Sequence, residues 1–141
     1  MKLHYDPCTV NCRKVLAGLK LMGIDFESEK YDYFDGLTGP SETGFRTLPA
    51  YLAINPMAEL PTLVDGDLKL WESNSILQYA ADARGPSAAY PTDLKVRADI
   101  NRWLLWESNK WFASCYVYLV ENVVKPVSYT HLRAHETSLH L

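Results

Sequence analysis

A proline inside an apolar run constrains the fold of this chain more than any other feature of its sequence. Pro61 stands between Leu60 and the apolar residues at 63–64, and proline cannot donate a backbone hydrogen bond to a strand ladder. Residues 62–71 nevertheless predict a hairpin, because an Asp-Gly pair at 65–66 joins two apolar runs. Glu72 and Ser73 then resemble the start of a helix. The stretch predicts a strand that begins at a proline, a second strand and a capped helix.

The residues before this hairpin alternate between strand and helix patterns. The expected order is β-α-β, a loop, and then β-β-α, because helical spacing follows the first strand pattern and ends at a glycine. Asn11 is the residue that we expect to cap the first helix. The predicted elements are a strand at 2–6, a helix that ends at Gly23, a half-exposed strand at 26–33, a turn-rich loop at 35–46 and one or two helical turns in 47–55.

Composition and charge exclude several classes of function. The chain has 141 residues, of which 48% are hydrophobic, and a net charge of −3, so nothing in its charge favours nucleic acid or an anionic membrane. No run approaches the roughly 18 apolar residues that a membrane span needs. The three cysteines, Cys8, Cys12 and Cys115, form no CxxC pair, and their odd number argues against a disulfide framework. We therefore expect a soluble, cytoplasmic protein.

Two motifs give the chain a specific resemblance. Residues 55–63, Asn-Pro-Met-Ala-Glu-Leu-Pro-Thr-Leu, resemble the NPxGxVPTL segment of cytosolic glutathione transferases, and residues 71–76 resemble the family's ESxAI motif. The resemblance extends in order from residue 1 to about residue 125 and is closest to the theta- and delta-like bacterial type. It implies an α/β fold: a thioredoxin-like βαβ-ββα N-terminal domain at 1–84, followed by the start of the family's all-α C-terminal domain.

The resemblance also implies a glutathione-binding site. In this family the bond before Pro61 is cis, and it leaves the Leu60 backbone N–H and C=O unpaired, so that an extended peptide docks there as an added strand segment. The cysteinyl part of glutathione fits that position. At Glu72 and Ser73, the start of a helix attracts the γ-glutamyl carboxylate, while Glu72 meets the ammonium group. Leu60, Pro61, Glu72 and Ser73 are therefore the predicted glutathione-binding residues.

The residue that activates the thiol has several candidates in the stretch before Arg13. The theta- and delta-like branch has a serine four residues before this arginine, and Thr9 stands at that position here. Threonine keeps the hydroxyl, although its methyl group restricts χ1. Cys8 is the rival, because a cysteine there suggests mixed-disulfide chemistry. Tyr5 is a third option that we expect to pack in the core, as we also expect of Cys12.

The resemblance implies a glutathione transferase that adds the glutathione thiolate to an electrophilic small molecule. Glutathione is then a co-substrate, with no metal and no bound cofactor, and the family implies a homodimer. Two alternatives stay open: a glutathione-dependent thiol reductase that uses Cys8, and a non-catalytic transferase-like module for protein association. The residue pairs at 60–61 and 72–73 argue against the module, because protein association requires neither.

The C-terminal part predicts an incomplete helical domain. Residues 85–91 form the expected linker, and residues 92–126 the first part of a truncated all-helical domain whose apolar stripe needs partner helices. Its tryptophans, Trp103, Trp106 and Trp111, are expected to pack against helices rather than to form a site.

The sequence of residues 127–141 indicates that this stretch does not come from the same gene as the rest of the chain. His131 and His135 are spaced i, i+4 beside Glu136, which on a helix suggests zinc. The stretch 127–137 also resembles the translation of a transposase-derived adapter used in sequencing libraries. We therefore reject a zinc site, interpret 127–141 as a non-native tail and exclude it from the fold.

Overall fold

The computed structural model describes residues 1–36, 41–85 and 87–124. The chain divides into two compact units, Met1–Asp93 and Leu94–Leu141. The predicted tail at 127–141 lies outside the described residues, so its interpretation stays a prediction, and so do the domain limits at 84 and 92. None of the described helices has the length and apolar character that crossing a bilayer requires.

The first unit is built on a four-stranded sheet with the strand order β2-β1-β3-β4. β1 pairs in parallel with β2 and antiparallel with β3, and β3 pairs antiparallel with β4. This topology confirms the predicted βαβ-ββα order. The elements are β1 (Lys2–Tyr5), α1 (Val10–Leu21), β2 (Glu27–Lys30), α2 (Pro49–Leu52), β3 (Thr62–Asp65), β4 (Leu68–Leu70) and α3 (Ser73–Ala83).

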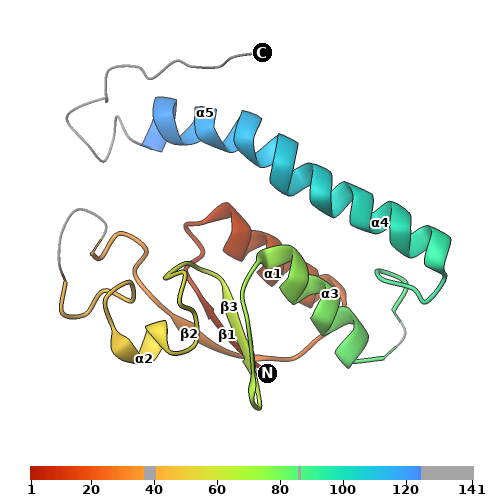
Figure 1. Ribbon diagram of the computed structural model, residues 1–141, viewed down its shortest axis with the longest axis horizontal. Coiled ribbons are helices and arrows are strands. Elements are labelled where there is room, and N and C mark those ends of the chain that lie inside the picture. The colour runs from red at the N-terminus through yellow and green to blue at the C-terminus, as the bar shows by residue number, and fades with distance from the viewer. Residues whose placement is uncertain (37–40, 86, 125–141) are drawn as a thin grey trace. The chain divides into compact units, whose positions relative to one another are not determined.

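Two buried clusters hold this unit together. α1 and α3 run side by side on one face of the sheet, and α2 lies on the other side (Figure 1). The first cluster joins α1, α3 and the sheet through side chains such as Leu3, Val15 and Ile76, all fully buried. The second includes the buried rings of Phe45 and Tyr51. Alternation along β1 sends Leu3 into the first cluster and the His4 ring against the Tyr51 ring.

Several predicted boundaries differ from the observed ones. The prediction that Asn11 caps α1 was wrong: Thr9 is the N-cap, its hydroxyl accepts the Cys12 N–H, and Asn11 lies in the first turn. The strand predicted at 26–33 is only Glu27–Lys30, because it pairs with the four residues of β1 and has no second neighbour. Gly23 follows the end of α1 with a φ of +65°, as the sequence predicted.

The second unit is a run of helical turns without a buried side chain in α4. It consists of α4 (Leu94–Trp106), a π-helical segment η1 (Glu107–Tyr116), the short α5 (Val117–Leu119) and a second π-helical segment η2 (Val120–Val124). The helix predicted from residue 92 thus begins two residues later. Trp103 and Trp106 are both exposed, and their rings form a T-shaped pair with centroids 5.6 Å apart.

Candidate functional site

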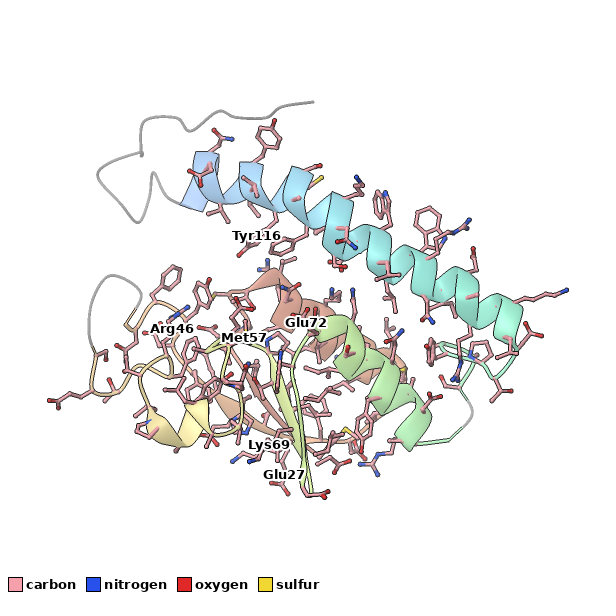
Figure 2. The ribbon with its side chains drawn as sticks, in the orientation of Figure 1. Glu27, Arg46, Met57, Lys69, Glu72 and Tyr116 are labelled. Atoms are coloured by element: carbon pink, nitrogen blue, oxygen red, sulfur yellow. The ribbon has the colours of Figure 1, made fainter. Side chains whose placement is uncertain are left out.

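The starts of α1 and α3 meet at one edge of the sheet. Both helices begin at the same edge (Figure 1). The Ser73 hydroxyl donates to the Asn11 side-chain oxygen across 3.5 Å, so the first turns of the two helices are in contact. Figure 2 shows that Glu72 lies toward this edge, and so does Met57, which belongs to the loop before β3. Glu27 lies at the opposite edge. Segments 62 residues apart in the chain thus contribute to one place.

Leu60 and Pro61 lie immediately before β3. The Leu60–Pro61 bond is cis, as the family resemblance implied. The register of β3 on β1 ends at the Thr62–His4 pair. No hydrogen bond joins the Leu60 backbone N–H or C=O to another residue in the described part of the chain. The Leu60 side chain packs into the second core cluster. Its backbone groups are therefore available for an added extended segment.

Glu72 and Ser73 stand where the sequence places them, at the start of α3. Glu72 has a left-handed backbone (φ +69°), and its carbonyl accepts the first helical hydrogen bond, from the Ile76 N–H at 3.0 Å. The Glu72 side chain makes no capping hydrogen bond, and the first turn of α3 contains no acidic residue. Ser73 is buried. The positive end of the helix dipole at this turn favours a negative charge, such as that of a carboxylate.

Thr9 and Asp6 organise the loop between β1 and α1. The Thr9 hydroxyl accepts the Cys12 N–H at 3.2 Å and donates to the Asp6 carbonyl across 3.4 Å. The Asp6 carboxylate accepts the N–H of Cys8 at 2.9 Å and of Tyr33 at 2.7 Å. Desolvation alone raises the pKa of Asp6, but these hydrogen bonds outweigh it and lower that pKa. Asp6 was not singled out from the sequence.

Neither the Cys8 thiol in this loop nor the Cys12 thiol in the first turn of α1 is held as a thiolate. Cys8 is exposed. Desolvation of its thiol, and next the negative charge of Asp6, raise the pKa of Cys8 to about 12. Burial likewise raises the pKa of Cys12, which is fully buried in the second core cluster as predicted. Tyr5, the third candidate, belongs to β1 and packs against both clusters.

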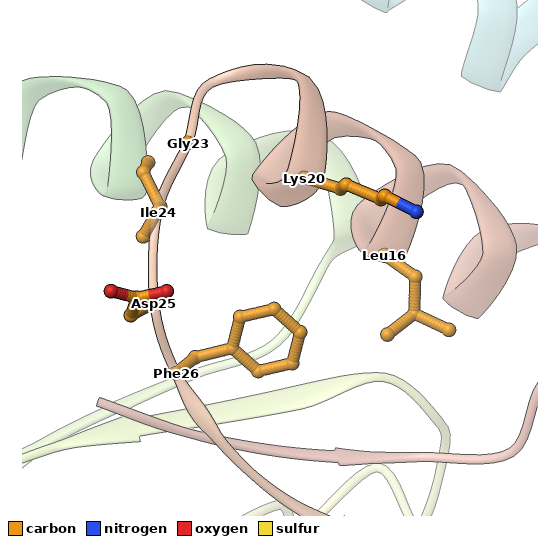
Figure 3. A pocket seen from close by; sticks show the side chains of 6 residues that line it. All are labelled: Leu16, Lys20, Gly23, Ile24, Asp25 and Phe26. Carbon is orange, nitrogen blue, oxygen red and sulfur yellow. The ribbon is translucent and has the colours of Figure 1, made fainter.

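A pocket beside α1 lies away from these residues. It has a volume of about 420 Å³ and is bounded by the second half of α1 and the loop after it. Figure 3 shows its lining, which contains none of the predicted site residues: Leu16, Lys20, Gly23, Ile24, Asp25 and Phe26. Among the described residues, no three His, Cys, Asp or Glu side chains are grouped to hold a metal ion. His131 and His135, whose spacing we did not take as a metal site, lie outside the described residues.

Known proteins resemble the chain over nearly its whole length. A probable glutathione S-transferase of Oryza sativa subsp. japonica is 30% identical over 129 residues, which cover 92% of this chain and 56% of that relative. Glutathione S-transferase theta-1 of Homo sapiens is 31% identical over 128 residues, which cover 90% of this chain and 50% of that relative. The chain thus spans about half the length of the curated relatives it matches.

A solved glutathione S-transferase structure is also similar to this chain in its fold. The theta class glutathione S-transferase of Xanthomonas axonopodis pv. citri, solved with glutathione bound, has a TM-score of 0.74 and 30% identity, and the match covers 90% of this chain and 57% of that chain. The model of the family described as glutathione S-transferase, N-terminal domain, matches residues 10–83. This chain therefore belongs to the glutathione S-transferase N-terminal domain family.

Proposed function

We propose that the chain is the glutathione-binding part of a glutathione transferase. The observation that carries this proposal is the contact between Asn11 and Ser73, which joins the starts of α1 and α3 at one edge of the sheet. The Leu60 backbone, just before β3, adds hydrogen-bonding groups that have no partner in the described part of the chain. A short peptide with a carboxylate at one end needs both features: an extended partner for its backbone and a helix start for its charge. The similar Xanthomonas transferase was solved with glutathione bound.

In the proposed complex, the cysteinyl backbone of glutathione pairs with Leu60, next to Pro61. The γ-glutamyl carboxylate binds at the α3 start, where it replaces the Asn11 side-chain oxygen as the acceptor of the Ser73 hydroxyl proton. Glu72 is exposed beside this turn and pairs with the γ-glutamyl ammonium. These four residues bind and orient the co-substrate, and none of them takes part in the chemical step.

The chemical step is the addition of the glutathione sulfur to an electrophilic small molecule. The thiol proton passes to solvent water, the sulfur electron pair forms a bond to the electrophilic carbon, and any leaving group departs with the electron pair of its bond to that carbon. A free thiol with a pKa near 8.5 is mostly protonated at neutral pH. A hydrogen-bond donor is therefore needed to stabilise the thiolate and lower this pKa. Thr9 is the proposed donor: its hydroxyl proton makes only a long contact of 3.4 Å with the Asp6 carbonyl, which a thiolate can replace.

The reductase alternative, which uses Cys8, has weaker support. A reductase needs an attacking thiolate, whereas desolvation and then Asp6 raise the pKa of Cys8 to about 12. The electrophilic substrate, the homodimer and the cytoplasmic location belong to the transferase proposal through the family resemblance.

Calorimetric titration of the full chain with glutathione tests the proposal. We expect saturable binding to one site per chain, competition by S-alkyl glutathione, and conjugation of an activated aryl halide. Consumption of a mixed disulfide that is lost on Cys8→Ala would favour the reductase instead. No binding of glutathione or of its S-alkyl derivative would leave the non-catalytic module as the better reading.

A further inference from the structure

Three buried donors converge on one backbone carbonyl beside the Leu60 turn. The Glu59 C=O accepts the Tyr51 hydroxyl at 2.5 Å, the Asn55 side-chain amide at 2.9 Å and the Thr62 hydroxyl at 3.3 Å. The donors also contact one another: the Thr62 oxygen lies 2.9 Å from the Tyr51 hydroxyl and 2.8 Å from the Asn55 amide nitrogen. Tyr51 is 2% exposed, and Asn55 and Thr62 are fully buried. The Glu59 carbonyl is therefore held from inside the domain.

This carbonyl belongs to the same peptide unit as the Leu60 N–H. A peptide unit is planar, and in the trans form its C=O and N–H point in opposite directions. Leu60–Pro61 is the only cis bond in the described part of the chain, so the Glu59–Leu60 unit is trans. Donors that fix the Glu59 C=O toward the interior thus turn the Leu60 N–H away from it, where the added segment is proposed to bind.

We propose that Tyr51 is a positioning residue for glutathione, which sets the direction of the Leu60 N–H through the Glu59 carbonyl. The inference rests on the proposed function of the Leu60 turn and adds a residue to it. Burial raises the pKa of Tyr51 to about 12, so the hydroxyl keeps its proton as a donor at neutral pH. A phenylalanine in the same place keeps the ring contacts and removes only this donor.

Tyr31 offers a matched control in the same cluster of rings. Its ring centroid lies 5.1 Å from that of Tyr51, and its hydroxyl bonds to Glu29 at 2.8 Å, away from the turn. We expect Tyr51→Phe to raise the Kd for glutathione about tenfold, with the pKa of the bound thiol unchanged, whereas Tyr31→Phe leaves the Kd within twofold of the wild type. If Tyr51→Phe fails to fold, Thr62→Val removes another donor to the same carbonyl and is expected to have the same effect.

A measurement without glutathione separates this inference from the proposed function. In the ligand-free chain, Tyr51→Phe should shift the carbonyl carbon resonance of Glu59 and broaden the amide resonance of Leu60, and Tyr31→Phe should change neither. A Kd within twofold of the wild type for Tyr51→Phe overturns the inference. If the wild-type chain binds no glutathione, the proposed function fails, and unchanged Glu59 and Leu60 resonances in Tyr51→Phe would then reject the positioning role as well.

Discussion

Ser73, the first residue of α3, donates its hydroxyl proton to the side-chain oxygen of Asn11 in the first turn of α1, 62 residues earlier in the chain. This contact brings the positive ends of two helix dipoles together. Two such ends beside each other repel, and a bound anion relieves that repulsion. The pair therefore explains physically why an anionic peptide would be held at this edge of the sheet.

The first prediction is that Ser73→Ala weakens the binding of glutathione by about 1–2 kcal/mol, because it removes a hydroxyl that bonds to a charged carboxylate. Calorimetry on both proteins measures this difference. Ser75→Ala is the control, since it removes a hydroxyl from the same helix two residues later. Equal affinities of the Ser73→Ala and wild-type proteins would remove Ser73 from the proposed site.

The second prediction separates Thr9 from Cys8. Thr9→Ala should raise the pKa of the bound glutathione thiol and slow conjugation, because it removes the proposed donor, whereas Thr9→Ser and Cys8→Ala should leave that pKa unchanged. The ultraviolet absorbance of the bound thiolate, titrated against pH, reports the pKa directly.

Thr9→Ala should also cost about 1 kcal/mol of folding stability, because it removes the N-cap of α1. Denaturant unfolding measures this loss independently of catalysis. A protein that loses stability but keeps the thiol pKa would show that Thr9 only caps the helix.

The local signals in the sequence predicted most of the first unit. The hairpin, the glycine after α1 and the helix start at Ser73 each depend on residues within a few positions of one another. The turn of the hairpin is Gly66–Asp67, one residue later than the predicted Asp65–Gly66, because Asp65 still pairs with Leu68. The cap of α1 was misplaced because Thr9 and Asn11 are both good N-cap residues. What decides between them is the loop: Thr9 donates its N–H to the Asp6 carbonyl at 3.2 Å and is thereby fixed before the first turn.

Long-range contacts could not be predicted in this way. Apolar periodicity indicates that Tyr51 is buried, but not that its hydroxyl meets the Glu59 carbonyl and Thr62 across a loop. The role of Asp6 depends on Tyr33, 27 residues later. Residues 107–124 contain no glycine or proline, and nothing in their sequence explains the change from α-helical to π-helical turns.

The third prediction concerns acid stability. Hydrogen bonds lower the pKa of Asp6 in the folded chain below its usual value of 3.8, so the unfolded chain takes up the proton first as the pH falls. The stabilisation is therefore complete at neutral pH and is lost as the pH falls through 3.8 and then through the folded pKa.

Asp6→Asn should accordingly destabilise the fold by about 1–2 kcal/mol at pH 7, because an amide oxygen is a weaker acceptor for the two N–H groups. The difference from the wild type should shrink below about pH 4. Denaturant melts at a series of pH values measure it, with Asp67→Asn, in the exposed hairpin turn, as the control. A difference that is independent of pH would contradict the assigned role of the Asp6 charge.

The last prediction concerns the packing of α1 on α3, which holds the two helix starts together. A Cβ atom added at Gly18 would lie 2.4 Å from the end of the Leu77 side chain. Alanine can be accommodated if Leu77 moves, and it also favours the helix. Valine adds two branched methyl groups at the contact, so Gly18→Val should destabilise the unit by about 1–3 kcal/mol.

Leu77→Ala removes the clashing methyl groups and should recover part of this loss in the double variant. Denaturant unfolding of the two single variants and the double variant measures the coupling. Additive losses would mean that Gly18 and Leu77 do not share the contact and that α1 tolerates a larger residue without moving against α3.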